Sequence, residues 1–260
     1  MAGSILIEAG NGVAVLTLNR PDAMNALDAE TARGLVDALD RLAMDRAVRV
    51  LVLAANGPVF SAGGDFNWVL TWPKLNAIER RVGADALMAA IDAVRNFPRP
   101  TIARVHGATV GGGIGVMLGC DYVLAAKTAR FGLTSALNCL LAGIAIPGLI
   151  EAVGPRVARQ LLMHGGLFDS ETALRIGLVD QVVEADKLDD AVVALAAELK
   201  LGAPEVQMLA KQLVSRIAAM PDRTEVAELV GIEVANQCVS EEAQEGMSAF
   251  LAKRTPKWAE

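Results

Sequence analysis

The first indication of the fold class is the run TVGGGIGVMLGCD, residues Thr109–Asp121. Its triple glycine lies between a strand-like run and a helix-like run, where backbone N–H groups commonly face a ligand. Nucleotide motifs do not fit the stretch, because Val116 stands where GxGxxG needs its third glycine and the sequence has no GxxxxGK[ST]. Packing is an equally good explanation on residues alone, since Gly115 and Gly119 share one helical face.

The preceding sequence alternates strands, turns and helices. Asn11-Gly12 separates two alternating runs and predicts a hairpin with a type I′ turn. Asp28 is the expected N-cap of a helix that leads to Val48–Ala55, an apolar run typical of a strand covered on both faces. That strand ends in a second glycine turn, FSAGGDF.

The sequence after the triple glycine becomes increasingly helical. Helical periodicity dominates from Pro155, with Ser170 as the expected N-cap of one helix and LVDQVV as a last short strand. We therefore expect an α/β core over residues 1–185 and a helical C-terminal region over residues 186–260, packed on the core or on a partner subunit.

The composition is that of a globular protein, with 260 residues, 53% hydrophobic and 21% charged. A net charge of −6 argues against nucleic-acid binding. Neither a run of about 18 apolar residues nor a signal peptide is found, so we expect a cytoplasmic protein without a membrane partner. The three cysteines and two histidines lack metal-ligand spacing, and we expect no metal.

Two separate turns without side chains suggest a specific chemistry. Each turn could aim one backbone N–H at the same carbonyl oxygen and so form an oxyanion hole. Such a pair stabilises an enolate or a tetrahedral oxyanion.

Five ordered motifs resemble the enoyl-CoA hydratase/isomerase (crotonase) superfamily over almost the whole chain: LNRPDAMNALD, FSAGGDF, RPTIARVHGATVGGGIGVMLGCDYVLAAKTARFGL, ALRIGLVDQVV and EEAQEGMSAFLAKRTPKW. The resemblance implies a crotonase-like spiral of ββα units with a C-terminal helical trimerisation region. It also implies a homo-trimer or hexamer, a role in fatty acid metabolism, and a coenzyme A thioester as substrate or ligand without a permanently bound cofactor.

The resemblance assigns roles to individual residues. It places the two oxyanion-hole N–H groups on Gly64 and Gly112. Residues bordering coenzyme A or the acyl group are then Ala23, Met24, Ala62, Asp65, Phe66, Trp68, Phe250 and Lys253. Trp72 could also shape the acyl pocket, although aromatic packing of a helix explains both tryptophans equally well.

The sequence departs from the family at its two catalytic glutamates, whose positions hold Gly115 and Ser135. The GGGxG form is nearest to methylglutaconyl-CoA-hydratase-like members, yet lacks both carboxylates. Efficient two-glutamate hydration is therefore not expected, because each well-placed acid or base contributes about 10²–10⁴ in rate. Other polar residues could approach the acyl group or serve structure: Asp65, His106, Asp121, Asn138, Cys139 and Glu151.

Two functions follow as hypotheses. The first is an enzyme, a lyase or isomerase of the enoyl-CoA hydratase/isomerase type, which acts through a thioester enolate. The second is a catalytically weakened subunit that binds CoA esters or serves assembly.

Overall fold

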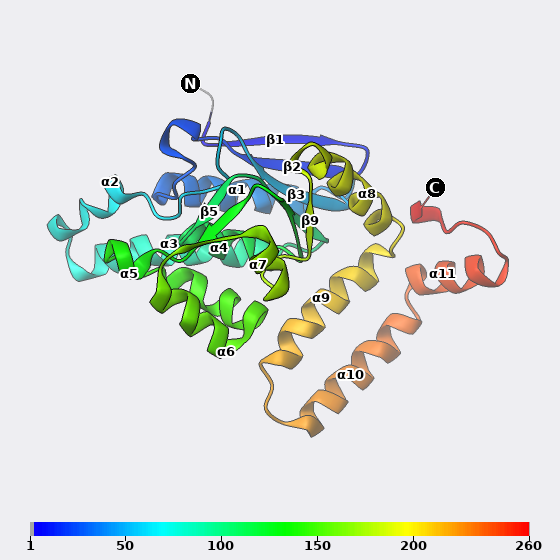
Figure 1. Cartoon of the computed structure of the whole chain (residues 1–260). Coiled ribbons are helices and arrows are strands. Elements are labelled where there is room, and N and C mark those ends of the chain that lie inside the picture. The colour runs from blue at the N-terminus through cyan, green and yellow to red at the C-terminus, as the bar shows by residue number, and fades with distance from the viewer. Residues whose placement is uncertain (1–2, 260) are drawn as a thin grey trace.

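The computed structural model describes residues 3–259 and shows a mixed α/β fold (Figure 1). The larger sheet has the order β1-β2-β3-β4-β6-β9; β1 and β2 pair antiparallel and the other pairs are parallel. Its strands are β1 (Ile5–Gly10), β2 (Val13–Leu18), β3 (Val50–Ala55), β4 (Thr101–Val105), β6 (Tyr122–Ala126) and β9 (Gln181–Val183). The smaller sheet contains β5 (Ala108–Val110), β7 (Arg130–Gly132) and β8 (Leu167–Asp169).

The first hairpin has the turn that the sequence predicts. Gly10 pairs with Val13, which leaves a two-residue loop of Asn11 and Gly12. Their φ angles are 52° and 79°, so both residues lie in the left-handed region that a type I′ turn requires.

Helices cover both faces of the larger sheet. Leu51 and Leu53 of β3 belong to the core cluster that contains α1 (Ala29–Met44) and α3 (Ala77–Arg95). Val50 and Val52, which alternate with them along β3, belong to a second cluster with α8 (Leu188–Lys200). This confirms the expected strand with two covered faces, because successive side chains point to opposite sides. The sheet thus provides a rigid support for the loops that follow its strands.

Among residues 3–259, six of the eleven α-helices begin at a side-chain cap. Asp28 accepts a hydrogen bond from Thr31 N and caps α1, as expected. The expectation that Ser170 caps a helix was wrong: Asp169 accepts from Thr172 N, and Ser170 is the first helical residue. Asp169 was overlooked because two adjacent residues can both serve as N-caps. The remaining α-helices are α2 (Phe66–Val69), α4 (Gly112–Met117), α5 (Ser135–Asn138), α6 (Ile146–His164), α7 (Ser170–Arg175), α9 (Pro204–Ala218), α10 (Arg223–Cys238) and α11 (Glu241–Leu251).

Short 3-10 helices complete the connections between these elements. Helix α6 has no side-chain cap and changes direction at Gly154, which has a φ of 73° and precedes Pro155. The 3-10 segments are η1 (Pro21–Ala23), η2 (Trp72–Lys74), η3 (Gly143–Ala145), η4 (Ala185–Lys187) and η5 (Lys257–Ala259).

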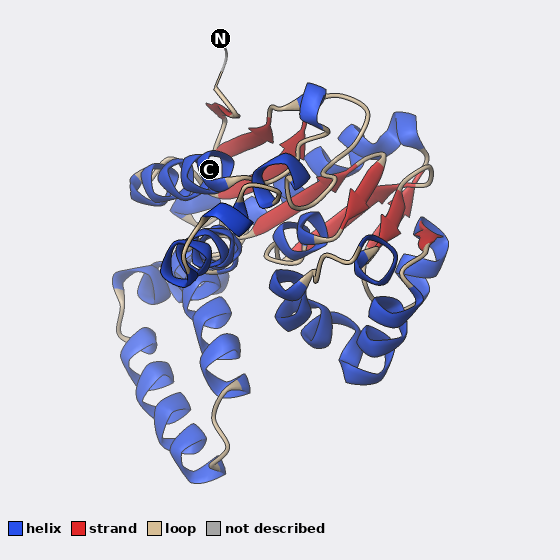
Figure 2. Ribbon diagram, turned by 90° about the vertical axis from the view of Figure 1, so that its left-hand side faces the viewer, coloured by secondary structure: helices blue, strands red, loops and turns tan. Residues whose placement is uncertain are grey.

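The C-terminal helices differ in how they contact the core. Helix α8 packs on the sheet, whereas α9 and α10 extend away from it as an antiparallel pair (Figures 1 and 2). Neither α9 nor α10 buries a residue, and both expose apolar side chains such as Val214 and Ile232. Arg49 holds the C-terminal segment against the core, because its guanidinium donates to the carbonyls of Lys200, Gly202 and Trp258.

Among residues 3–259, no helix combines the length with the apolar character that a membrane span requires. The histidine, cysteine and acidic side chains of these residues form no group of three or more that could hold a metal ion.

Candidate active site

Two glycine turns contact each other beside the sheet. We call residues 61–65 the first glycine turn and residues 110–113 the second. Val110 N–H in the second turn donates to Ser61 O in the first over 2.9 Å. A Cβ on Gly63, whose φ is 89°, would lie 2.6 Å from Val110 O. Glycine at position 63 is therefore required by both the conformation and the close approach.

The N–H groups of Gly64 and Gly112 have no acceptor among the described residues. Gly64 and Leu27 form a parallel β-bridge, but its hydrogen bonds involve the residues on either side of Gly64. Leu27 N–H donates to Gly63 O, and Asp65 N–H donates to Leu27 O. The Gly64 N–H thus points away from Leu27. Gly112 begins α4, where an N–H lacks an intrahelical acceptor. A Cβ on Gly112 would lie 3.6 Å from Gly64 N, so the two donors are close together.

Two apolar side chains lie beside these two glycines. The nearest described atom to a Cβ placed on Gly64 is Leu140 Cδ2, at 3.9 Å. Ile144 Cδ1 would lie 2.9 Å from a Cβ on Gly112. No sequence pattern had marked Leu140 or Ile144, because their segment lacks both periodicity and polar residues. The two glycines that carry the donors are therefore bordered by hydrocarbon on their Cβ sides.

Asp65 has a structural role next to the first donor. One carboxylate oxygen caps α2 by accepting from Asn67 N and Trp68 N. The other accepts from Arg20 over 3.0 Å, and Arg20 also pairs with Asp28 at 2.9 Å. Asp65 is 7% exposed. Asp65 thus serves structure, one of the two roles considered from the sequence, and both oxygens of its carboxylate are engaged.

Three aromatic side chains follow Asp65 along the chain. Phe66 is 49% exposed, whereas Trp68 is partly buried against the core. Trp68 and Trp72 pack edge to face, with ring centroids 5.2 Å apart, and both rings approach Gly83 of α3. Helix packing is thus one role of the tryptophans. Trp72 also has a buried indole N–H without a partner among the described residues.

The two positions that the resemblance assigns to glutamates lie in different helices, α4 and α5. Gly115 lies inside α4, and a Cβ there would be 2.8 Å from Ile91 Cδ1 and 3.2 Å from Ala145 Cα. The close packing inferred from the sequence is therefore present at this glycine. Ser135 begins α5, and its side chain lies outside the described part of the structure.

Two of the other polar candidates bond to neighbouring groups. The Nε2 atom of His106 bonds Gly57 O at 2.8 Å, and its Nδ1 atom accepts from Arg104. His106 thus has the structural role that the sequence suggested. Asn138 donates to Thr134 Oγ1 within its own helical turn, and its side chain is exposed.

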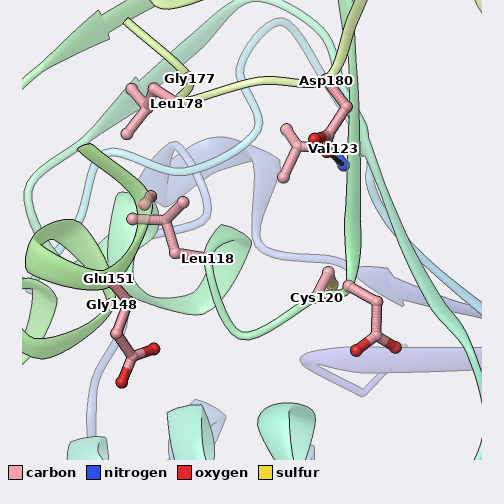
Figure 3. Close-up of a pocket in the computed structure, with 10 residues that line it drawn as sticks. Leu118, Cys120, Val123, Gly148, Glu151, Gly177, Leu178 and Asp180 are labelled. Carbon is pink, nitrogen blue, oxygen red and sulfur yellow. Dashed lines mark hydrogen bonds between the residues drawn. The ribbon is translucent and has the colours of Figure 1, made fainter. Parts of the chain in front are cut away.

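Further candidates line a separate pocket, shown in Figure 3. Glu151 pairs with Arg95 at 2.8 Å, and Asp121 pairs with Lys211 at 2.7 Å. Burial raises the pKa of the Cys120 thiol to about 12, so it is protonated and unreactive at neutral pH. None of the residues lining this pocket belongs to the glycine turns. Through its pair with Lys211, Asp121 joins α9 to the core and so serves structure, one of the two roles considered from the sequence.

The residues expected near coenzyme A form two separate groups. Ala62 N–H donates to Met24 O over 2.9 Å, which places Ala23, Met24 and the first glycine turn together. Phe250 and Lys253 lie at the end of α11, on the opposite side of the molecule from α2 (Figure 1). Phe250 is 83% exposed. A single chain thus does not bring the two groups together.

Comparisons with known proteins agree with this architecture. The family model described as Enoyl-CoA hydratase/isomerase matches residues 8–260. The chain is 32% identical to 2,3-dehydroadipyl-CoA hydratase of Escherichia coli, with 97% of each chain covered. It is 31% identical to crotonyl-CoA hydratase of Syntrophomonas wolfei, with 96% of each covered.

A solved enoyl-CoA hydratase from Mycobacterium smegmatis has the same fold, with a TM-score of 0.92, 30% identity and full coverage of both chains. This likeness confirms the crotonase-like α/β fold expected from the motifs. The chain belongs to the enoyl-CoA hydratase/isomerase family.

Proposed function

We propose that this chain binds an acyl-CoA thioester and stabilises its enolate oxygen with the N–H groups of Gly64 and Gly112. The observation that carries the proposal is that two adjacent turns each hold one N–H donor for which residues 3–259 show no acceptor. Donors held in place by the backbone need no reorganisation when charge develops on the thioester oxygen, so they stabilise the transition state more than the ground state.

Coenzyme A is the proposed ligand because the relatives are named for CoA thioesters and the family model shares that description. The backbone around Ala23 and Met24 and the adjoining Ala62 would border the nucleotide. Lys253 would supply a cation for a phosphate group, and Phe250 would pack beside it. Since these two residues lie far from the glycine turns of their own chain, we propose that they serve a neighbouring subunit.

A homo-trimer or a dimer of trimers is the assembly that fits this arrangement. The exposed apolar side chains of α9 and α10 support it, because an isolated helical pair gains little from leaving such residues in water. The neighbouring subunits would also bring the end of α11 to another chain's glycine turns.

The second candidate is a subunit that binds CoA esters without efficient turnover. Two observations favour it: both oxygens of Asp65 are engaged, and position 115 has neither a carboxylate nor space for one. Under this alternative the backbone donors would still bind the thioester, because they do not depend on side chains.

Calorimetry with crotonyl-CoA and acetyl-CoA tests the proposal directly. We expect binding of both, and the absence of heat at millimolar ligand would contradict it. A panel of enoyl-, dienoyl- and malonyl-type CoA esters then separates the two candidates. Turnover at about 1–10³ per second favours the enzyme, and binding without turnover favours the subunit.

A further inference from the structure

Ser61 is a fully buried serine whose hydroxyl group bonds within the first glycine turn. Its exposed fraction is 0%. The hydroxyl donates to Asn25 O over 2.8 Å and accepts from Gly63 N–H over 3.2 Å. Because a carbonyl oxygen can only accept, the hydroxyl hydrogen points to Asn25 and the oxygen lone pairs are left for Gly63 N–H. The two partners therefore fix the orientation of this hydroxyl.

Asn25, which accepts from the Ser61 hydroxyl, is itself firmly held. It is 1% exposed, and its φ of 51° lies in the left-handed region that asparagine tolerates better than most residues. Its side-chain amide donates to Asn56 O over 2.8 Å and to Val59 O over 3.0 Å, and it accepts from Arg20 N–H over 2.8 Å. The carbonyl that receives the hydroxyl of Ser61 therefore has a fixed position.

The bond to Gly63 N–H influences the direction of the neighbouring donor. The peptide between Gly63 and Gly64 joins two glycines, whose backbones are freer to rotate than those of other residues. The N–H of Gly63 is held by the Ser61 hydroxyl, and its carbonyl oxygen accepts from Leu27 N–H over 2.7 Å. This peptide is trans, so its N–H points opposite to the Gly63 carbonyl. Both bonds of Gly63 thus constrain the direction of the Gly64 N–H.

Ser61 also contacts the second glycine turn. Ser61 O accepts from Val110 N–H over 2.9 Å, and a Cβ on Gly113 would lie 2.7 Å from Ser61 Cβ. The serine side chain therefore packs directly on the backbone of Gly113, next to Gly112. Thr109 pairs with Ser61 in a parallel β-bridge and is equally buried, but its hydroxyl has no partner among the described residues. Of these two buried hydroxyl groups, only that of Ser61 is hydrogen-bonded to a glycine turn in the described part of the chain.

We propose that Ser61 is a positioning residue for the thioester oxygen, an inference that rests on the proposed function and deepens it. In this role Ser61 makes no contact with the ligand and acts through the two turns. Its hydroxyl holds the peptide that carries the Gly64 N–H, and its Cβ sets the distance to Gly113, so both donors are aimed at one oxygen. Loss of the hydroxyl leaves both N–H groups in place but poorly aligned. The expected loss in kcat is therefore about tenfold, less than the 10²–10³ that removal of a donor typically costs.

The most direct measurement is the infrared stretching frequency of the thioester carbonyl in bound acetyl-CoA that carries ¹³C at this carbon. Hydrogen bonds to the oxygen lower this frequency, and fixed donors in a buried site lower it more than water does. We expect a lower frequency in the wild-type complex than for free acetyl-CoA in water. Ser61→Ala should move the frequency back towards the free value, while the dissociation constant of acetyl-CoA stays within about threefold.

Two control variants separate positioning from a loss of stability. Ser170 is also 0% exposed, and its hydroxyl donates to Lys127 O over 2.9 Å, a bond that involves neither glycine turn. Ser61→Ala and Ser170→Ala should both lower the melting temperature by a few degrees, because each leaves a buried polar group unpaired. Thr109→Val removes the unpartnered hydroxyl at the bridge. Ser170→Ala and Thr109→Val should both keep the wild-type carbonyl frequency.

The outcomes that contradict the proposal are distinct. An unchanged carbonyl frequency in folded Ser61→Ala would overturn it, and so would an equal change in Ser170→Ala, which would assign the effect to stability. If Ser61→Ala does not fold, Ser61→Cys provides the test. Its thiol is a weaker donor and acceptor, so the frequency should lie between the wild-type and free values, and a wild-type frequency would again refute positioning.

The wild-type protein distinguishes failure of this proposal from failure of the proposed function. If wild-type protein binds no acetyl-CoA, or binds it without lowering the carbonyl frequency, the oxyanion hole is absent and both proposals fail. If the wild-type frequency is lowered and the Ser61 variants share it, the oxyanion hole stands and only the positioning role of Ser61 is refuted.

Discussion

The most informative substitutions are at Gly64, where one variant can add a side chain and keep the N–H while another removes the N–H. A Cβ at this position has Leu140 Cδ2 as its nearest described neighbour, at 3.9 Å, which is ordinary contact. The φ of Gly64 is not positive, unlike that of Gly63. Gly64→Ala should therefore fold normally and keep the donor. Gly64→Pro adds carbon at the same place but removes the N–H.

The expected difference between these two variants follows from the loss of one oxyanion donor. Such a loss typically costs about 10²–10³ in kcat, or roughly 2.7–4 kcal/mol. The assay is kcat for the most rapidly converted CoA thioester of the panel, with circular dichroism and calorimetric binding of acetyl-CoA as checks on folding. We expect Gly64→Ala to stay within about tenfold of wild type and Gly64→Pro to lose at least about 10² relative to Gly64→Ala. If folded Gly64→Pro turns over as fast as Gly64→Ala, the N–H of residue 64 does not act in catalysis.

Three further predictions concern the acid–base positions, the assembly and the C-terminal ion pair. The native protein should hydrate crotonyl-CoA at least about 10³-fold more slowly than an ordinary hydratase, and a native rate typical of the family would refute this. The double variant Gly115→Glu with Ser135→Glu should recover hydration only in part, because a side chain at position 115 meets packed atoms. Sedimentation should show a trimer or hexamer, and truncation before Glu241 should weaken both assembly and CoA affinity; a stable micromolar monomer would contradict it. Hydrogen bonds from the Arg254 guanidinium lower the pKa of Glu245 to about 2. The stabilisation of the folded state by this ion pair is therefore present above the unfolded pKa of about 4.3 and is lost as pH falls towards 2. Fluorescence of Trp258 should follow this loss, and a Glu245→Gln variant that shows the same acid transition would exclude Glu245 as its cause.

Local signals in the sequence predicted the elements that support the site. Asn11-Gly12 predicted its hairpin because few other pairs adopt two positive φ angles. The continuous apolar run that contains β3 predicted a strand with two covered faces, since alternation is lost when both sides are buried. The two glycine turns were recognised because each lacks side chains at the end of a strand. These features depend on residues that are close together in the chain.

The remaining features depend on contacts between distant segments. The sequence could not show that Leu140 and Ile144 would border Gly64 and Gly112, because apolar residues in an irregular segment carry no periodicity. The partner of Asp65 was equally hidden, since Arg20 lies 45 positions away. The cap at Asp169 was displaced by one residue because its neighbour is also a good cap.

The proposed function requires that Gly64 and Gly112 together bind the oxygen of a CoA thioester. A crystal structure with a bound acyl-CoA, or with a thioether analogue that retains the acyl carbonyl, would show whether they do. We expect the carbonyl oxygen about 2.7–3.1 Å from both backbone nitrogens, with the acyl chain against Leu140 and Ile144. A bound thioester whose carbonyl oxygen contacts neither nitrogen would show that the two glycine turns do not form an oxyanion hole.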